Sequence, residues 1–260
     1  MHHIHIDRFA GMSSPVHSLD PRNKLLSTLV FIIAVVLTPD SYFFSFIVYI
    51  GFMLFLIYLS HVPILFILKR SLTLVPFAIA VSLFVPFITP GQALWEFSFG
   101  PFGTSITDNG LIRFISIGFK AFISFFATIT LVSSTRFGDL MRAAGKLGLP
   151  TKMVVILSFM YRYLFILIDE AAHMVLARDI RGSGQKRIPL LAATGSIIGA
   201  LFIRSYEHAE KLYYAMLIRG YSGKPVTLNP MKLTVKDAVF PLAVLGIVTF
   251  GIAAGRFMNG

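Results

Sequence analysis

The sequence predicts an all-α integral membrane protein with about five transmembrane helices and, in addition, long amphipathic helices in the cytoplasm. Of its 260 residues, 56% are hydrophobic and 13% are charged, whereas an ordinary soluble domain is roughly 45–50% apolar and about 25% charged. This composition excludes a disordered chain, a coiled coil and a typical soluble enzyme. The charges are unequal, because 23 Lys and Arg residues exceed 12 Asp and Glu residues and give a net charge of +11. A chain this hydrophobic must hold most of its cations outside the lipid.

Five stretches are long and apolar enough to cross the hydrocarbon core, which takes about 20 residues. Asp20 is expected to cap the first stretch, and Pro21 suits the first position of a helix. Pro76 and Pro86 predict kinks in the third. The predicted spans are 21–37, 42–59, 72–88, 108–134 and 238–257.

The distribution of Lys and Arg predicts a cytoplasmic N-terminus. The connections at 38–41 and 89–110 contain neither residue, whereas the N-terminal region carries three cations and Lys69 and Arg70 follow the second span. Since positively charged connections stay in the cytoplasm, the two connections without cations are expected outside.

A long segment, residues 135–237, holds most of the positive charge. It could be drawn with a transmembrane hairpin at 153–168 and 190–203, but that drawing would put Arg162 in mid-membrane. We therefore expect amphipathic helices along or below the cytoplasmic face. The chain then divides into an N-terminal segment with four spans (1–134), a cytoplasmic or interfacial domain (135–237) and a final span (238–260). The 15 cations of the segment are Arg136, Arg142, Lys146, Lys152, Arg162, Arg178, Arg181, Lys186, Arg187, Arg204, Lys211, Arg219, Lys224, Lys232 and Lys236.

Start and stop signals divide this segment into three predicted helices, at 137–147, 151–181 and 189–219. Thr151 is expected to cap the second helix, and Gly182 and Gly220 follow the last residues of the two long ones. At 1.5 Å per residue, helices of thirty-odd residues are roughly 45 Å long.

The ends of the two long helices repeat one another at an offset of 38 residues. Each closes as Ala-x-x-Ile-Arg-Gly, once at 177–182 and once at 215–220. Ala and Arg, four residues apart, share a helix face. Helix capping accounts for the Arg-Gly pair. A docking surface for a partner would also account for the small Ala one turn earlier, because it lets a partner approach closely. The pattern leaves both interpretations open.

With these motifs, the sequence resembles the transmembrane coupling subunit, or T component, of energy-coupling factor transporters, in the cobalt-type (CbiQ-like) branch. The resemblance covers nearly the whole chain. It also includes residues 14–25 before the first span, Ser133-Ser134-Thr135 after the fourth, and Gly148-Leu149-Pro150 before the long helix.

The resemblance implies that each motif docks into a groove on one of two ATP-hydrolysing subunits. In the first motif either Arg178 or Arg181 could insert deepest, and the sequence leaves this open. The implied docking residues are Ala177, Arg178, Asp179, Arg181 and Gly182 in the first motif, and Ala215, Met216, Arg219 and Gly220 in the second.

The resemblance also implies the partners and the cargo. The partners are two cytoplasmic subunits, which bind ATP and Mg, and a substrate-binding membrane subunit. Whether a small accessory membrane subunit also takes part is left open by the sequence. The cargo would be cobalt or nickel ions. The expected location is the bacterial cytoplasmic membrane.

The sequence contains none of the common catalytic motifs. It lacks a Walker A sequence, a His-Glu-x-x-His helix and a nucleophile elbow. It also has no cysteine and no aspartate-rich cluster. We therefore expect a non-catalytic subunit with no metal or cofactor of its own. Nucleic acid is a poor explanation of the charge, because the cations flank apolar helices.

Two cations stand inside the fourth predicted span. Arg113 and Lys120 are seven residues apart and share a helix face. They predict either a polar seam that faces the bundle or a partner, or side chains that snorkel or pair within the bundle. The alternative function, a self-contained channel or carrier for a small cation, would need further polar groups near mid-bilayer.

Overall fold

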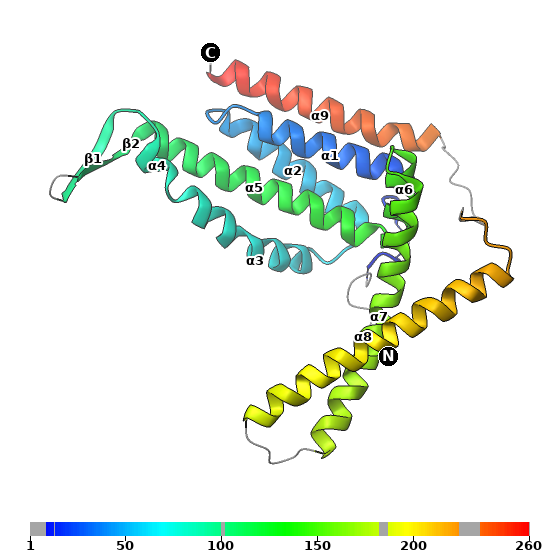
Figure 1. Ribbon diagram of the computed structural model, residues 1–260. Helices are drawn as coiled ribbons and strands as arrows, with labels where there is room; N and C mark the ends of the chain where they lie inside the picture. Colours follow the sequence, from blue (N-terminus) through cyan, green and yellow to red (C-terminus); the bar gives the residue numbers. More distant parts are fainter. Residues whose placement is uncertain (1–8, 13, 100–101, 182–186, 224–234, 260) are drawn as a thin grey trace. The chain divides into compact units, whose positions relative to one another are not determined.

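The computed structural model describes residues 9–12, 14–99, 102–181, 187–223 and 235–259 (Figure 1). The predicted all-α membrane fold is confirmed, with one addition, a β-hairpin inside the predicted connection 89–110. In the described residues the elements are α1 Pro21–Leu37, α2 Phe43–Ser60, α3 Ile64–Ser82, α4 Val85–Ile88, β1 Ala93–Phe99, β2 Phe102–Thr107, α5 Asp108–Ser134, α6 Phe137–Lys146, α7 Thr151–Arg181, α8 Arg187–Ile218 and α9 Val235–Asn259.

Contacts between residues divide the described chain into two compact units. One unit, which we call the bundle, comprises residues 9–143 and 235–259. The other, which we call the α7–α8 unit, comprises residues 144–223. The predicted limits of the cytoplasmic segment, 135 and 237, concern the membrane boundary and stay predictions.

Five helical stretches in the described residues are long and apolar enough to cross a membrane. Four of them coincide with predicted spans and lie in α2, α3–α4, α5 and α9. The fifth is α7, which we expected at the membrane surface, and α1 with its 17 residues is not among them. The described residues thus contain as many candidate spans as the sequence predicts, with α7 among them and the 17-residue α1 one residue shorter than the shortest of them. The stretches are Phe43–Ser60, Ile64–Ile88, Asp108–Ser134, Thr151–Arg181 and Asp237–Phe257.

The third span differs from its prediction at its start, whereas its end at Ile88 agrees. It begins at Ile64, eight residues earlier than expected, so Lys69 and Arg70 lie inside α3 and not in a connection. Arg70 is positioned over the ring of Phe66, with its guanidinium carbon 5.8 Å from the ring centroid. Of the two prolines predicted to cause kinks, Pro86 follows a break between α3 and α4, whereas Pro76 lies inside α3, which continues past it.

Most helix ends agree with the local signals in the sequence. The carboxylate of Asp20 accepts a hydrogen bond of 2.8 Å from the backbone N–H of Arg22, which confirms Asp20 as the cap of α1. Thr151 was wrongly expected to cap α7, because it is the first residue of that helix. The other two predicted helices of the basic segment end within two residues of α6 and α8.

The core of the bundle lies among α1, α2, α5 and α9, which run side by side in Figure 1. Phe31 of α1 meets the ring of Tyr49 of α2 edge-on at 5.7 Å between centroids. Ile123 and Phe126 of α5 join this cluster, as does Val244 of α9. Buried aromatic and branched side chains from four helices thus fix the bundle that carries the charged sites described below.

Two glycines let α9 approach α2 closely. Gly251 and Gly255 are four residues apart on α9, the small-x-x-x-small spacing of membrane helix contacts. A Cβ atom at Gly251 would lie 2.7 Å from the ring of Tyr49, and one at Gly255 would lie 2.8 Å from the ring of Tyr42. The hydroxyl of Ser45 donates a 2.7 Å hydrogen bond to the carbonyl of Gly251. This close contact depends on the missing side chains.

A buried ammonium group ties the N-terminal segment to two helices. Lys24 of α1 is 3% exposed, and its Nζ donates to the carbonyls of His17 at 3.1 Å and Ser134 at 3.3 Å. The carboxylates of Asp139, Asp20 and Asp237 also attract its charge. A buried cation is tolerated only with such compensation. Lys24 therefore holds the end of α5 against the start of α1.

The start of α9 is attached to the same end of α1. One carboxylate oxygen of Asp237 accepts a 2.8 Å hydrogen bond from the backbone N–H of Asp20, and the side-chain amide of Asn23 donates 2.9 Å to the carbonyl of Asp237. These contacts join residues more than 200 positions apart. They close the bundle at the end where α1 and α9 both begin.

We expect Gly251→Ala to destabilise the protein and Gly246→Ala not to. The first change forces a methyl group against the buried ring of Tyr49, and overpacking of this kind costs about 1–3 kcal/mol. Gly246 lies on the same helix with nothing within 4 Å of an added Cβ, so its substitution is neutral or stabilising by up to about 1 kcal/mol. Thermal unfolding of both variants in detergent measures the difference. Equal unfolding temperatures would contradict the close contact.

We expect stability to fall as the pH drops below about 6.5, the ordinary pKa of histidine. Burial lowers the pKa of His17, whose ring nitrogens lie 2.7 Å from the Ser14 hydroxyl and 2.9 Å from the carbonyl of Phe9. The unfolded chain then takes up a proton before the folded chain does, so the free energy of unfolding decreases. Unfolding temperatures between about pH 7.5 and 5.5 test this. His17→Gln, which does not titrate, should flatten the dependence, and an unchanged slope would exclude His17 as its source.

Candidate functional site

The last turn of α7 places its two arginines in different environments. The guanidinium of Arg178 donates to Asp179 at 2.7 Å and 3.0 Å, and to the hydroxyl of Thr194 on α8 at 3.1 Å. Its side chain is 24% exposed. Arg181 is exposed, and in the described part of the chain it forms no ion pair. Gly182 lies outside the described residues. Of the two candidate docking arginines, Arg178 is therefore engaged within the chain and Arg181 is available.

The end of α8 is a Schellman motif. Gly220 has a φ of 78°, its N–H donates 2.9 Å to the carbonyl of Leu217, and the N–H of Tyr221 donates 3.0 Å to the carbonyl of Met216. The capping interpretation is therefore right for Gly220. It does not involve the side chain of Arg219, which is exposed, as is Ala215 one turn before it. Capping and availability for docking are compatible at this helix end.

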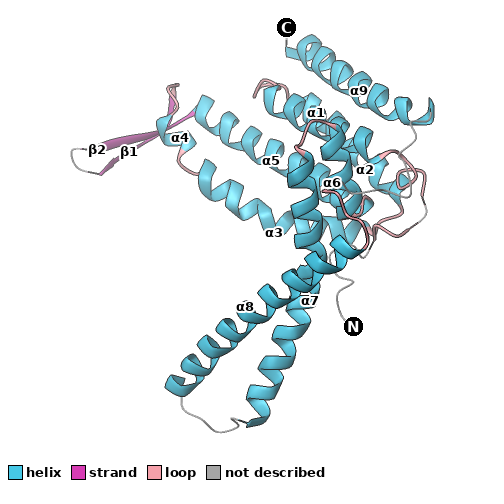
Figure 2. Ribbon diagram, turned by 45° about the vertical axis from the view of Figure 1, so that its right-hand side comes forward, coloured by secondary structure: helices cyan, strands magenta, loops and turns pink. Residues whose placement is uncertain are grey.

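The two helix ends with free arginines lie far apart within the α7–α8 unit. Helix α8 begins beside the end of α7, where Thr194 meets Arg178, and runs away from it toward Arg219 (Figures 1 and 2). The 25 residues from Thr194 to Arg219 correspond to about 37 Å of helix. The two motifs cannot share one small binding site, but they can reach two separate ones.

A groove of about 510 Å³ lies between α7 and α8. Its walls include Ala177, Ala193 and Ala200, and arginines line its polar side. One of them, Arg204, forms an ion pair with Glu170 across the two helices. Together with Arg178 and Thr194, this pair fixes how α7 and α8 cross.

In the bundle, the structure brings Arg113 and Lys120 together with Asp40. The Nζ of Lys120 lies 2.7 Å from one carboxylate oxygen of Asp40, and the Nε of Arg113 lies 3.3 Å from the other. Ser116, between them on α5, donates 2.6 Å to the carbonyl of Asp40. Lys120 is 16% exposed and Arg113 is 56% exposed. The structure thus agrees with pairing inside the bundle for Lys120, through a partner that the sequence did not indicate.

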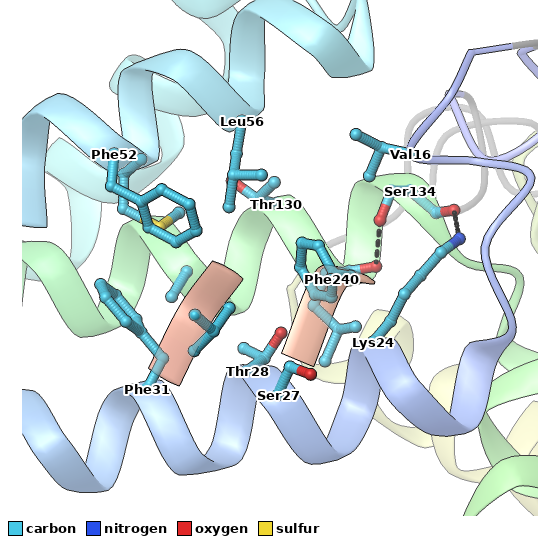
Figure 3. Close-up of a pocket in the computed structure, with 14 residues that line it drawn as sticks. Val16, Lys24, Ser27, Thr28, Phe31, Phe52, Leu56, Thr130, Ser134 and Phe240 are labelled. Carbon is cyan, nitrogen blue, oxygen red and sulfur yellow. Dashed lines mark hydrogen bonds between the residues drawn. The ribbon is translucent and has the colours of Figure 1, made fainter. Parts of the chain in front are cut away.

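The bundle also contains a small cavity among α1, α2, α5 and α9, shown in Figure 3. Its volume is about 30 Å³, enough for one or two water molecules. Phe31, Phe52 and Phe240 form its walls, and the hydroxyl of Ser27, buried at its edge, has no hydrogen-bond partner among the described residues. No group of three His, Asp or Glu residues that could hold a metal ion occurs in the described part of the chain.

Some residues of these sites escaped the sequence analysis. Asp40 is the only charged residue of the connection 38–41, and an acid beside a span with two cations is a signal for pairing. Thr194 and the pair of Glu170 with Arg204 had no local signal, because each depends on the way α7 and α8 cross.

Comparison with known proteins gives consistent matches over most of the chain. The profile of the CbiQ family, described as a cobalt transport protein, matches residues 12–228. An uncharacterized protein of Methanocaldococcus jannaschii is 30% identical over 243 residues, covering 92% of this chain and 82% of that protein.

Two further relatives carry the name energy-coupling factor transporter transmembrane protein EcfT. The one from Staphylococcus aureus is 29% identical and covers 92% of this chain and 94% of its own length. The one from Thermanaerovibrio acidaminovorans is 25% identical and covers 98% and 96%.

We expect Asp40→Asn to destabilise the bundle by about 1–3 kcal/mol, the cost of a buried group left without its partner. The substitution leaves Lys120 mostly buried with no carboxylate. The double variant Asp40→Asn with Lys120→Met should be less destabilised than the sum of the single changes. Arg113→Gln, at an exposed position, is the control and should cost no more than about 1 kcal/mol. Denaturant unfolding in detergent measures all four, and strictly additive effects would refute the coupling.

Proposed function

This chain belongs to the CbiQ family and is the T component of an energy-coupling factor transporter, and on that premise we propose that it transmits motion from two cytoplasmic ATPase subunits to a substrate-binding membrane subunit. The chain itself is non-catalytic in this proposal. ATP and Mg are bound by the ATPase subunits. The four apolar stretches of the bundle and the named relatives agree with a multi-pass membrane protein, and α7, which also has the length and composition of a span, lies on the cytoplasmic side in this proposal.

The observation that carries this proposal is the pair of free arginines at separate helix ends. Arg181 and Arg219 are exposed and unpaired within the described residues, while Arg178 is held by Asp179 and Thr194. A guanidinium can form bidentate hydrogen bonds with a carboxylate of a partner. We infer that Arg181 is the docking arginine of the first motif, and that Arg178 positions the helix end that carries it.

The proposed mechanism uses the α7–α8 unit as a lever. When ATP binding brings the ATPase subunits together, the helix ends at Arg181 and Arg219 move with them. The contacts between α7 and α8, through Arg204 with Glu170 and Arg178 with Thr194, pass this motion along both helices. The surface that holds the substrate-binding subunit then rearranges, and that subunit releases its cargo.

The orientation of the chain in the membrane and the identity of the cargo are further parts of the proposal. The excess of cations in residues 135–237 supports a cytoplasmic position for that segment and for the N-terminus, in the bacterial cytoplasmic membrane. The family description supports cobalt as the cargo, with nickel as the second candidate. The ion is bound by the partner subunit and not by this chain.

A self-contained channel or carrier for a small cation is the rival function. It would need a polar chamber of substrate size near mid-bilayer. The cavity of Figure 3 is about 30 Å³ in volume and mainly apolar. The one carboxylate of the charged cluster, Asp40, is already paired with both Arg113 and Lys120. Both observations favour the coupling subunit.

We expect Arg181→Glu combined with Arg219→Glu to prevent productive docking. Charge reversal at a central arginine of an interface costs about 2 kcal/mol or more, which is roughly a 30-fold loss of affinity. Co-purification of the ATPase subunits and ATP-driven cobalt uptake should therefore both fall. Lys211→Glu, an exposed cation of α8 outside the motif, is the matched control. Unchanged assembly and uptake in the double variant would overturn the proposal.

A further inference from the structure

The hairpin of β1 and β2 stands where two apolar helical stretches end. The stretch Ile64–Ile88 ends four residues before β1, and α5 begins directly after β2. Four residues span at most about 14 Å. If these stretches cross the membrane, the hairpin therefore begins at the membrane–water interface, on whichever side that is.

The base of the hairpin is anchored to both helices. The hydroxyl of Thr107 donates 2.7 Å to the carbonyl of Thr89, and the backbone N–H of Asp108 donates 3.1 Å to the carbonyl of Gln92. Thr107 also caps α5 through the N–H of Gly110. A Cβ atom at Gly110 would lie 2.7 Å from the Cα of Pro86 in α4. These contacts fix the level at which the hairpin leaves the bundle.

The register of the two strands separates aromatic from polar positions. Residues directly opposite one another in an antiparallel pair share a face. Trp95 pairs with Ile106, Phe97 with Thr104, and Phe99 with Phe102. On the other face, Glu96 pairs with Ser105 and Ser98 with Gly103. One face therefore has five apolar positions of six, and the paired positions of the other are all polar or glycine, while Leu94 lies at a register shift outside these pairs.

A two-stranded hairpin needs another surface to be stable. An isolated one is marginal at best in water, and Figures 1 and 2 both show this hairpin extending beyond α4 and α5, away from the rest of the bundle. A hairpin that extends in this way gains stability when its apolar face packs against another surface. The hairpin also has no Lys or Arg, and its one acid, Glu96, is on the polar face.

The surface beside the hairpin indicates lipid as the cover of this face. Helix α4 contacts β2, and α3–α4 expose Val81, Phe84 and Ile88 at 78%, 66% and 78%. These exposed apolar residues belong to a stretch fit to cross the membrane, so lipid covers them. Trp and other aromatic residues concentrate at membrane interfaces, where an apolar face meets lipid and a polar face meets water. Because β2 contacts α4, the hairpin adjoins this exposed apolar surface.

We propose that the β1–β2 hairpin lies on the membrane–water interface with the Trp95 face on the lipid and the Glu96 face toward water. This inference does not depend on the proposed coupling function. It makes the hairpin a lipid-bound anchor that fixes the depth of α4 and α5 in the bilayer.

Trp95 is the single tryptophan of the chain, so its fluorescence reports this position without further labelling. The full chain is reconstituted in phosphatidylcholine vesicles whose acyl chains carry bromine, a quencher within the lipid. Acrylamide serves as the quencher in water. We expect strong quenching by the brominated lipid, weak quenching by acrylamide and a blue-shifted emission.

Two variants control for the face of the hairpin. W95F combined with S98W moves the reporter three residues along β1 to the polar face, and acrylamide quenching should become several-fold stronger. W95F combined with F97W keeps it on the aromatic face and should behave like the wild type. If acrylamide quenches Trp95 as strongly as the reporter at position 98, the inference is wrong. If Trp95 is shielded from acrylamide but not quenched by the brominated lipid, protein covers the face and the inference is equally wrong.

Discussion

A charge withdrawn from water must be matched by an opposite charge or by hydrogen-bond acceptors, and this constraint divides the cations of the protein into two groups. Lys24 is buried and Lys120 is mostly buried, and each is compensated, the first by two backbone carbonyls and the second by Asp40. Arg181 and Arg219 are exposed at helix ends. The first two cations stabilise the bundle, whereas Arg181 and Arg219 form no ion pair among the described residues and can bind partners. The net charge of +11 therefore includes both cations that stabilise the bundle and cations at exposed helix ends.

The helices were predictable to the residue where their ends depend on neighbouring residues. α1, α5 and α7 begin and end as expected, because Asp, Pro and Gly act within one turn of a helix end. The start of α3 was not found, since Lys69 and Arg70 interrupt its apolar run. The hairpin was missed although its signal is present, in the alternation from Trp95 to Phe99 and the Gly100-Pro101 pair after it. That stretch was considered only for its charges.

The candidate site was predictable as a motif but not as a geometry. The repeat of Ala-x-x-Ile-Arg-Gly identified the two helix ends, yet both arginines of the first end looked alike in the sequence. Their difference depends on Thr194, which lies on another helix and engages Arg178. The partner of Lys120 was hidden for the same reason, since Asp40 lies 80 positions away. Contacts between distant residues decide which charged groups stay available, and local patterns do not contain them.

The close approach of α9 to α2 has a consequence for biogenesis. α9 is synthesised after every other helix described, yet it contacts both α1 and α2, which leave the ribosome first. Until α9 inserts, the hydroxyl of Ser45 and the backbone N–H of Asp20 lack the partners that they have in the folded protein. A nascent chain that stops short of α9 therefore leaves polar groups at the starts of its first two helices without these partners.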